Sequence, residues 1–545
     1  MADLSTRTNA IPVDVERANG VTRPWVVIGF ILIPVFIGSL DLTVVSAFLP
    51  KLIAELGLPF DTALDDATWM VTGYLLAYTI SLTFMGRLSD LYGRRAIYVG
   101  CLLTFIVGSV ITALAGTPVL GNETLTDQVY LMLRRMGQRP DPAYVELQVI
   151  IVGRVIAALG AGALVPVSLA LVGDLFPPHR RAQPLGLIGA VDTLGWVLGP
   201  VYGAIFLRFM PWQGLFLLNV PLTLLTLFAV LYALRRVPQL KAPGSFDLLG
   251  TILIGGALSA LTIGLGANID TSSVARGLSS LQTLPTYALP VLSIGAIMFL
   301  LFVLLESRLR HPLIRPGMFR KPPVASGALI NLFIGYVLFI GLVSVPVLIN
   351  VRAGDTTLLD QAALEVGLVL STLTIPMAIA TVPGGWLSER IGAANTVRIG
   401  LSLALLGYVA IWLTWTLDIG FLLLAAEMAV IGVGIGFTFS PISASIINNA
   451  RDDERGVAGA VVLILRLVGM TLSVSSLSSL MLNRVNTLAN ERALVDGVFD
   501  AAVFAQTYAE SAVTVLREIG LVGAILCAVA ILPTRWLSMK KHDER

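Results

Sequence analysis

Four ionisable residues stand inside long apolar runs of this 545-residue chain: Asp41, Asp192, Arg154 and Arg466. A charge within a membrane-spanning helix costs about 2.5–3.5 kcal/mol on insertion scales, so such residues mark transport pathways or coupling sites. An adjacent arginine keeps a carboxylate ionised, whereas withdrawing the arginine from a dry site favours proton uptake by the acid. Asp41 and Asp192 are therefore predicted to exchange protons. The alternative is a permanent pairing that holds helices together.

The glutamate, histidine and cysteine side chains give weaker evidence for a functional site than these four charges. Glu427 also lies in an apolar run, but only about two helical turns from its end, where the carboxylate can reach water. The three histidines, His179, His311 and His542, fall in polar connections and are not expected to carry protons. Both cysteines lie in apolar runs, so neither a disulfide framework nor a metal site is expected. Because no nucleophile–base set and no phosphate-binding loop appears, the chain is not expected to be an enzyme or to need a cofactor.

A charged cluster joins two of the apolar runs, with the sequence Gly86-Arg-Leu-Ser-Asp-Leu-Tyr-Gly-Arg-Arg95. Its two glycines permit a tight turn and a close approach of neighbouring helices. The acid and the arginines are predicted to latch the ends of helices, and the simpler alternative is that the arginines only hold the connection in the cytoplasm. The residues assigned to this gating motif are Gly86, Asp90, Gly93, Arg94 and Arg95.

These residues require an apolar scaffold, and the composition supplies one. The chain is 56% hydrophobic and only 13% charged, which indicates a polytopic membrane protein that is all α-helical. With about 20 apolar residues needed for each crossing, the sequence contains fourteen candidate spans. They lie near residues 25–49, 67–86, 96–115, 148–172, 184–207, 214–234, 248–266, 285–305, 323–350, 365–386, 397–416, 420–446, 456–482 and 513–534.

The distribution of positive charge predicts the orientation. If the N-terminus is cytoplasmic, the inside connections and tails hold about two thirds of the 36 Lys and Arg residues. Both termini are therefore placed in the cytoplasm, and the membrane is expected to be the cell (plasma) membrane. The first 24 residues are polar and carry no signal-peptide pattern, so they are interpreted as a cytoplasmic tail.

An internal repeat divides the chain. Gly385-Trp-Leu-Ser-Glu-Arg-Ile-Gly392 repeats the Gly, Leu, Ser, acid and Gly positions of Gly86–Gly93, and each copy follows the second span of its half. Repeated halves around a central path are the layout of secondary transporters. The predicted organisation is a tail at 1–24, a six-helix half at 25–234, a linker with two inserted helices at 235–322, a second six-helix half at 323–534 and a tail at 535–545.

A small-residue face is predicted on the fifth span. Gly195, Gly199 and Gly203 recur every four residues, so they lie on one side of a helix that another helix can approach closely, and Pro200 adds a bend. The functional interpretation is a movable seam that seals the cavity toward the outside. The alternative is a static packing seam.

Taken together, these motifs resemble the major facilitator superfamily. The cluster at Gly86–Arg95 resembles its cytoplasmic loop signature, with Leu91 in place of an arginine. Gly195 to Gly203 resembles the fifth-helix motif of proton-coupled antiporters. Within the fourteen-helix drug:proton antiporters, the chain is most similar to mycobacterial exporters of triacylglycerols and related lipids. That similarity is carried by Ser39-Leu-Asp41-Leu-Thr-Val-Val, Thr68-Trp69, Asp192-Thr-Leu-Gly195 and Leu465-Arg466-Leu-Val-Gly469-Met470.

The resemblance implies a proton-coupled antiporter that exports hydrophobic or amphipathic compounds, including lipids, by alternating access. It places the coupling residues at Asp41, Asp192 and Arg466, with Arg154 as a further pathway or structural charge. It also implies that residues 483–512 prolong the neighbouring helices outward. The residues at 116–147 are themselves mixed polar and amphipathic, and a solvated loop is the alternative for both segments. The alternatives are a multidrug efflux pump with little lipid activity and a membrane sensor or scaffold that does not transport.

The expected partners follow from this interpretation. They are the lipid bilayer and a small hydrophobic or lipid substrate, with an acceptor protein on the outer side as a further candidate. No nucleic-acid partner is expected, and the protein is expected to be a monomer.

Overall fold

A computed structural model of the chain describes residues 24–45, 48–58, 60–120, 123–138, 140–235, 237, 239, 241–265, 287–353, 359–495, 498–499 and 501–537. Each of the fourteen predicted spans coincides with a helix in these ranges, so the all-helical fold is confirmed. Twelve of these helices are long and apolar enough to cross a membrane. The other two are α3 and the 17-residue α9 (Leu248–Gly264), so the count of fourteen is supported approximately. The predicted tails lie largely outside the described residues.

The first half of the chain forms one helical bundle. Its elements are α1 (Pro24–Val44), α2 (Leu49–Glu55), α3 (Phe60–Tyr92), α4 (Arg94–Leu114), β1 (Pro118–Leu120), β2 (Glu123–Thr124), α5 (Leu125–Arg135), α6 (Pro142–Leu175), the 3-10 turn η3 (Pro178–Arg180), α7 (Ala182–Phe206) and α8 (Trp212–Leu234). Within this bundle α6 packs against α3 and α4, while α1 packs against α7 and α8.

The second half forms another bundle. Its elements are α12 (Pro322–Ala353), α13 (Leu359–Ile391), α14 (Ala393–Thr414), α15 (Phe421–Asn449), the 3-10 turn η7 (Asp452–Glu454), α16 (Arg455–Ala493), β3 (Leu494–Val495), β4 (Val498–Phe499), α17 (Ala501–Ile531) and η8 (Leu532–Trp536). Between the halves, α9 pairs with α11 (Ala288–Glu306) and packs on α3, and η5 (Pro316–Arg320) leads into α12.

The packing of the two bundles follows one scheme. The contacts of α6 with α3 and α4 correspond to those of α15 with α13 and α14, and the contacts of α1 with α7 and α8 correspond to those of α12 with α16 and α17. Gly93 before α4 and Gly392 before α14 both have positive φ, at 99° and 88°, a conformation that glycine adopts without strain. The sequence repeat is therefore also a repeat in backbone geometry.

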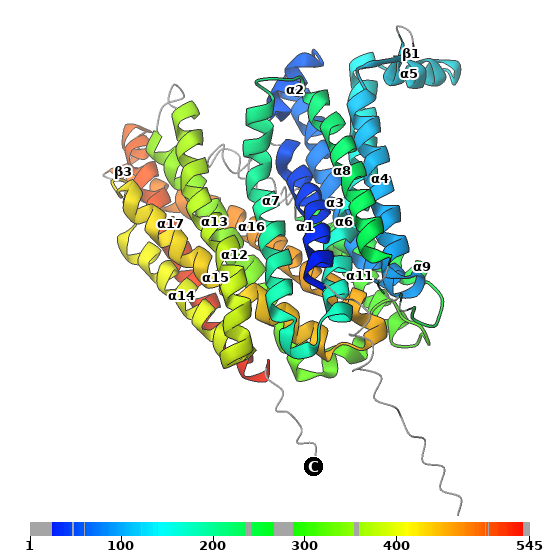
Figure 1. Ribbon diagram of the computed structural model, residues 1–545. Coiled ribbons are helices and arrows are strands. Elements are labelled where there is room, and N and C mark those ends of the chain that lie inside the picture. The colour runs from blue at the N-terminus through cyan, green and yellow to red at the C-terminus, as the bar shows by residue number, and fades with distance from the viewer. Residues whose placement is uncertain are drawn as a thin grey trace, which may run out of the picture.

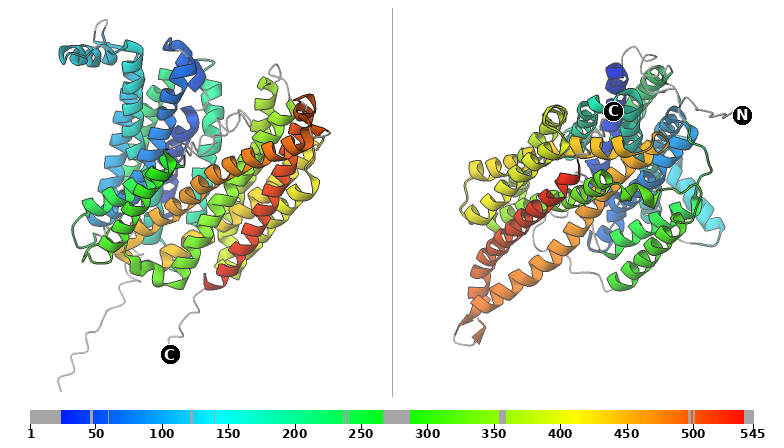
Figure 2. Two further views of the ribbon diagram at one scale, coloured as in Figure 1. Left: turned by 180° about the vertical axis from the view of Figure 1, so that it is seen from behind. Right: turned by 90° about the horizontal axis from the view of Figure 1, so that it is seen from below.

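The two bundles meet at one end and diverge at the other (Figure 1). They lie together at the motif end, where α3 passes into α4 at Gly93. The main contacts between bundles pair α16 with α3 and α6, and α7 with α13 and α15. The view from behind shows the same divergence toward the end that carries α2, α5 and β3 (Figure 2). Each half thus contributes the helix that leads into its motif, α3 or α13, and this helix packs on α16 or α7 of the opposite half.

Several helices run beyond the predicted apolar spans. α6 starts at Pro142, where the Asp141 side chain accepts a hydrogen bond from the Ala143 N–H, and it starts six residues before the predicted span. α16 continues to Ala493 and α17 starts at Ala501, so residues 483–512 do prolong these helices, as the resemblance implied. Within 116–147 the structure places a short β1–β2 pair and α5 in addition to the start of α6.

Candidate functional site

Asp41 and Arg154 form a buried ion pair between α1 and α6. The Nη1 of Arg154 donates to Asp41 Oδ2 over 2.5 Å, and its Nη2 donates to the Asp41 carbonyl over 3.0 Å. Asn219 on α8 donates to the other carboxylate oxygen over 2.9 Å. Because both oxygens are occupied and both charged side chains are essentially inaccessible, this acid is held by fixed partners in this conformation.

Aromatic rings complete the surroundings of Arg154. Its guanidinium carbon lies 4.0 Å from the ring centroid of Tyr74 and 5.4 Å from that of Phe216. Cation–π contact adds to the attraction from Asp41 in a site that excludes water. Gly108 of α4 and Gly153 of α6 let the backbones of these two helices touch, and Gly153 directly precedes Arg154 in the sequence. The pair and its immediate neighbours therefore come from four helices of one bundle, α1, α3, α6 and α8.

Asp192 has a different environment. Ser39 on α1 donates to Asp192 Oδ1 over 2.6 Å, and no other hydrogen bond from a described residue reaches this carboxylate. Asp192 lines a cavity of about 360 Å³ between the two bundles, and Arg466 lines the same cavity from α16. Among the described residues, no carboxylate oxygen lies within 4.0 Å of the Arg466 guanidinium. The acid and the arginine thus face one cavity without forming a direct ion pair.

Arg466 is held by stacking and by close helix packing. Its guanidinium carbon lies 3.6 Å from the ring centroid of Phe439 on α15, and its buried Nε has no hydrogen-bond partner. Gly335 on α12 lies against the backbone carbonyl of Arg466, where a Cβ would overlap the oxygen. This contact places α12 directly against α16 and sets the depth of Arg466 in the cavity.

The remaining cavity wall is mostly apolar. It is built from both bundles, with α1, α3 and α7 on one side and α12, α13, α15 and α16 on the other. Polar side chains other than Asp192 and Arg466 are few in this wall, and they are Thr43, Tyr78, Thr193, Trp196, Ser371 and Thr374. A cavity of this kind suits a hydrophobic or amphipathic ligand.

The glycine face of α7 packs against α1. A Cβ at Gly195 would lie 2.6 Å from the Cβ of Ser39, and a Cβ at Gly199 would overlap the hydroxyl of Thr43. Thr43 also donates to the Trp196 carbonyl over 2.9 Å. This seam lies within one bundle, and the close approach that it permits brings Ser39 to Asp192. Gly203 is buried on the same helix, and Pro200 lines the cavity.

The structure separates Asp41 from the other two members of the predicted coupling trio. Asp41 lies with Arg154, whereas Asp192 and Arg466 share the cavity. Sequence reasoning did not assign Asn219, Ser39 or Phe439 to the site. Ser39 stood in a motif that carries the family resemblance, and Asn219 and Phe439 stood in apolar runs, but their roles depend on which helices pack together.

Glu427 occupies a closed site near the end of α14. Its two carboxylate oxygens accept from the Thr414 hydroxyl over 2.6 Å and from the Trp415 indole N–H over 2.8 Å. Since both oxygens are bonded and the side chain is buried, Glu427 ties the start of α15 to the end of α14. This geometry is that of a structural residue, and it does not bring Glu427 to the cavity.

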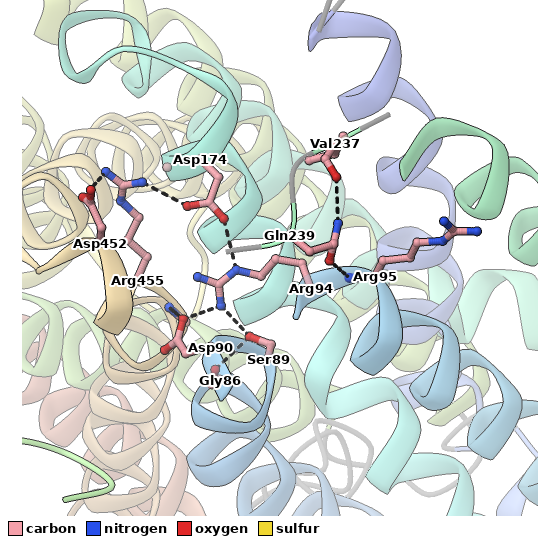
Figure 3. Close-up of polar contacts among 12 residues, drawn as sticks. Gly86, Ser89, Asp90, Arg94, Arg95, Asp174, Val237, Gln239, Asp452 and Arg455 are labelled. Carbon is pink, nitrogen blue, oxygen red and sulfur yellow. Dashed lines mark hydrogen bonds and ion pairs between the residues drawn. The ribbon is translucent and has the colours of Figure 1, made fainter. Parts of the chain in front are cut away.

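At the motif end, Asp90 connects the two bundles (Figure 3). Its carboxylate accepts from the backbone N–H groups of Gly456 over 3.0 Å and of Val457 over 3.3 Å, at the start of α16. The first turn of a helix presents free N–H groups and a partial positive charge, so it binds a carboxylate well. Gly86 lies against Gly456, and a Cβ at either position would overlap the carbonyl of the other.

Arg94 extends this contact into a chain of charges. It pairs with Asp90 and donates to Asp174 over 3.1 Å. Asp174 in turn accepts from Arg455 over 3.0 Å, and Arg455 donates to Asp452 over 2.6 Å, so the chain crosses from α4 and α6 to α16 (Figure 3). The Arg95 backbone N–H donates to Gln239 over 2.9 Å, and its side chain takes no part in this chain.

The second copy of the motif makes an equivalent contact. Glu389, at the position of Asp90, accepts from the Gln183 backbone N–H over 3.3 Å and from the Gln183 side chain over 2.7 Å. Gln183 lies in the first turn of α7, which corresponds to α16 in the other half. Each acid therefore binds the start of the fifth helix of the opposite bundle. The Glu389 contact is exposed, whereas the Asp90 contact is buried.

No group of three or more His, Cys, Asp or Glu side chains that could hold a metal ion occurs in the part of the chain that the structure describes. The arrangement supports two physical operations. A cavity between two bundles can close and open as the motif end is released, and the Asp192 carboxylate can meet or lose the field of Arg466 as the bundles move.

Comparison with known proteins gives a consistent result. The sequence profile of the Major Facilitator Superfamily matches residues 31–474. A triacylglyceride transporter of Mycolicibacterium smegmatis is 30% identical over 534 residues, covering 94% of this chain and 87% of that protein. A triacylglyceride transporter of Mycobacterium tuberculosis strain H37Rv is 30% identical over 531 residues, covering 94% of each.

Solved structures share the architecture at low sequence identity. The human organic anion transporter MFSD10 is 15% identical with a TM-score of 0.55, covering 92% of this chain and 99% of that one. The proton:xylose symporter XylE is 14% identical with a TM-score of 0.52, covering 92% of this chain and 94% of that one. These similarities concern the fold.

Proposed function

The chain belongs to the Major Facilitator Superfamily, and on that premise we propose that it is a proton-coupled antiporter that exports hydrophobic or amphipathic compounds. The observation that carries the proposal is the cavity between the bundles, in which Asp192 and Arg466 are the charged groups of an otherwise largely apolar wall. Triacylglycerols and related lipids are the first candidate cargo, because relatives that match 94% of the chain are named triacylglyceride transporters.

Proton coupling is assigned primarily to Asp192. Within the described part of the chain this acid accepts one hydrogen bond, from Ser39, and it lines the same cavity as Arg466 without an ion pair between them. When the bundles approach, Arg466 favours the ionised acid, and when they separate in a dry cavity, the acid takes up a proton. Asp41, whose oxygens are both bonded, then has the supporting role of fixing α1 against α6 in this state.

The motif end sets the direction of access. With Asp90 bonded to α16 and the cavity lying between bundles that diverge at the other end, the conformation is assigned to the outward-facing side of an alternating-access cycle (Figure 1). The motif end and both termini are placed in the cytoplasm and the protein in the cell membrane, following the positive charge of the connections at that end.

A multidrug efflux pump is the second candidate function. The specific observation in its favour is the Asp192 carboxylate, which is open to an apolar cavity and could pair with a lipophilic cation. A sensor or scaffold without transport has less support, because such a role would not require charged groups from both bundles on one cavity wall.

Transport in proteoliposomes tests the proposal. Purified protein is reconstituted with an imposed pH gradient, and the movement of a fluorescent triacylglycerol analogue is compared with that of a lipophilic cation. We expect the gradient to drive the lipid analogue, with little movement in Asp192→Asn and normal movement in Glu427→Gln, a buried acid outside the cavity. Transport that ignores the gradient would rule out proton coupling, and movement of the cation alone would favour the multidrug function.

A further inference from the structure

The amphipathic helix α5 is attached to the first bundle through α4 and α6 but extends beyond it. It starts at Leu125 with a capping box, in which Thr124 and Asp127 exchange hydrogen bonds between side chain and backbone over 2.8 and 3.0 Å. The bonds from the Thr124 backbone and hydroxyl lower the pKa of the Asp127 carboxyl. The start of the helix is therefore fixed by its own side chains.

The depth of α5 relative to the membrane follows from its attachment. The Thr126 hydroxyl donates to the Ala115 carbonyl, at the end of α4, over 2.5 Å. α4 has 21 residues and rises about 1.5 Å per residue, which gives about 30 Å, the thickness of the hydrocarbon layer. Since α4 starts at the motif end, its far end and the first turn of α5 lie at the opposite headgroup layer.

The side chains of α5 separate into two arcs. At about 100° per residue, the apolar arc contains Leu125, Val129, Tyr130, Met132, Leu133 and Met136, and the opposite arc contains Asp127, Gln128, Arg134 and Arg135, with Leu131 the apolar exception. The inner part of the apolar arc packs on the core. Its outer part does not, because Met132 is 64% and Met136 is 67% exposed.

The direction of α5 places this uncovered face beyond the bundle. Both side views show the helix projecting sideways from the end of α4, roughly perpendicular to the spanning helices (Figures 1 and 2). A helix with this orientation at the headgroup level overlies lipid instead of protein. Its last turn carries Arg134 and Arg135, whose charge complements lipid phosphates.

We propose that α5 is a membrane-surface helix that inserts Met132 and Met136 below the headgroups of the leaflet opposite the motif end and binds anionic headgroups through Arg134 and Arg135. Arg134 lies 5.7 Å from the ring centroid of Tyr130, so the tyrosine and the arginine together form the boundary between the apolar arc and water. The helix then fixes the depth at which α4 and α6 sit in the bilayer. This role is independent of the cargo and of proton coupling.

Spin labels on the two arcs test the orientation. Single labels are attached to Met132→Cys, Met136→Cys and Arg134→Cys of the full chain in nanodiscs; the natural cysteines, Cys101 and Cys527, are buried and can remain. Positions 132 and 134 are about 200° apart on the helix, so the third label is a matched control. We expect labels 132 and 136 to collide mainly with oxygen, which concentrates in lipid, and label 134 mainly with a water-soluble nickel complex.

Two outcomes would overturn the proposal. If labels 132 and 136 are as accessible to the nickel complex as label 134, the helix is in water. If they are inaccessible to both reagents, another protein or a second copy of the chain covers the face. A separate comparison tests the headgroup contact. Labels 132 and 136 should lie deeper in phosphatidylcholine nanodiscs that contain phosphatidylglycerol than in nanodiscs of phosphatidylcholine alone. Replacing both Arg134 and Arg135 with Gln should remove that difference in depth. Equal depth in the two lipids would refute the binding of anionic headgroups.

Discussion

Removing the carboxylate of Asp90 should open the motif end. In this conformation Asp90 accepts two hydrogen bonds from the start of α16, and these bonds exist only while the bundles are together. Hydrogen bonds to a charged group contribute about 1.5–3 kcal/mol each, so the pair contributes at least about 3 kcal/mol to the closed motif end. A change of that size corresponds to about 150-fold in a conformational equilibrium. Arg94 keeps Asp174 as a partner in Asp90→Ala, so no buried cation is left unpaired.

The equilibrium can be read from a distance between the bundles. His179 and Asn395 are exposed and lie at the motif end of opposite bundles. Spin labels on His179→Cys and Asn395→Cys therefore report the distance between the bundles at this end, measured by pulsed electron paramagnetic resonance in nanodiscs. Asp90→Ala should convert a mainly short distance into a mainly long one, and Asp90→Asn should give about half the free-energy change. Glu389→Ala is the matched control, because its contact in the second repeat is exposed and should matter less. An unchanged distribution in Asp90→Ala would refute the latch.

Three further predictions concern packing and charge. Gly86→Ala places a methyl group on the Gly456 carbonyl and should also favour the open motif end in the same distance measurement. Gly100→Ala, where the added methyl group meets open space, should leave the distance unchanged. Equal effects of the two variants would contradict the close-contact argument. Arg154→Met leaves the Asp41 carboxylate buried without its cation and should lower the free energy of unfolding by about 3–5 kcal/mol in a thermal or denaturant assay. The double variant with Asp41→Asn should recover part of this loss. No loss in the single variant would show that the pair is dispensable. Glu427→Ala leaves the Trp415 N–H unpaired and should cost about 1–3 kcal/mol, while transport per folded molecule stays unchanged; lost transport at normal stability would reassign Glu427 to the pathway.

The sequence was sufficient for the architecture because a bilayer imposes a simple rule on it. Each span must be apolar over about 20 residues, so the positions of the helices and the repeat at Gly86 and Gly385 could be read directly. The same rule does not predict where the helices end, because a helix can continue beyond its apolar part. The spans near 148–172 and 456–482 cover only the apolar parts of α6 and α16, whose extensions to Pro142 and Ala493 are also helical.

The pairing of charges could not be read in the same way. The positions of Asp41, Arg154 and Arg466 along their helices limit only roughly which charges can pair. The actual partner depends on which helices pack against each other. Asp41 lies with Arg154 because α1 and α6 are in the same bundle, while Arg466 lies on α16 across the cavity. The Ser39–Asp192 bond likewise depends on the approach of α1 to the glycine face of α7.

The central claim is that Asp192 couples cargo movement to protons, and one comparison in proteoliposomes tests it most directly. The cargo that the wild-type protein moves is followed both in exchange without a pH gradient and in accumulation driven by one. In Asp192→Asn, we predict that exchange continues while the gradient no longer drives accumulation, because the cavity remains but its titratable group is lost. Gradient-driven accumulation by Asp192→Asn at the wild-type level would contradict the account.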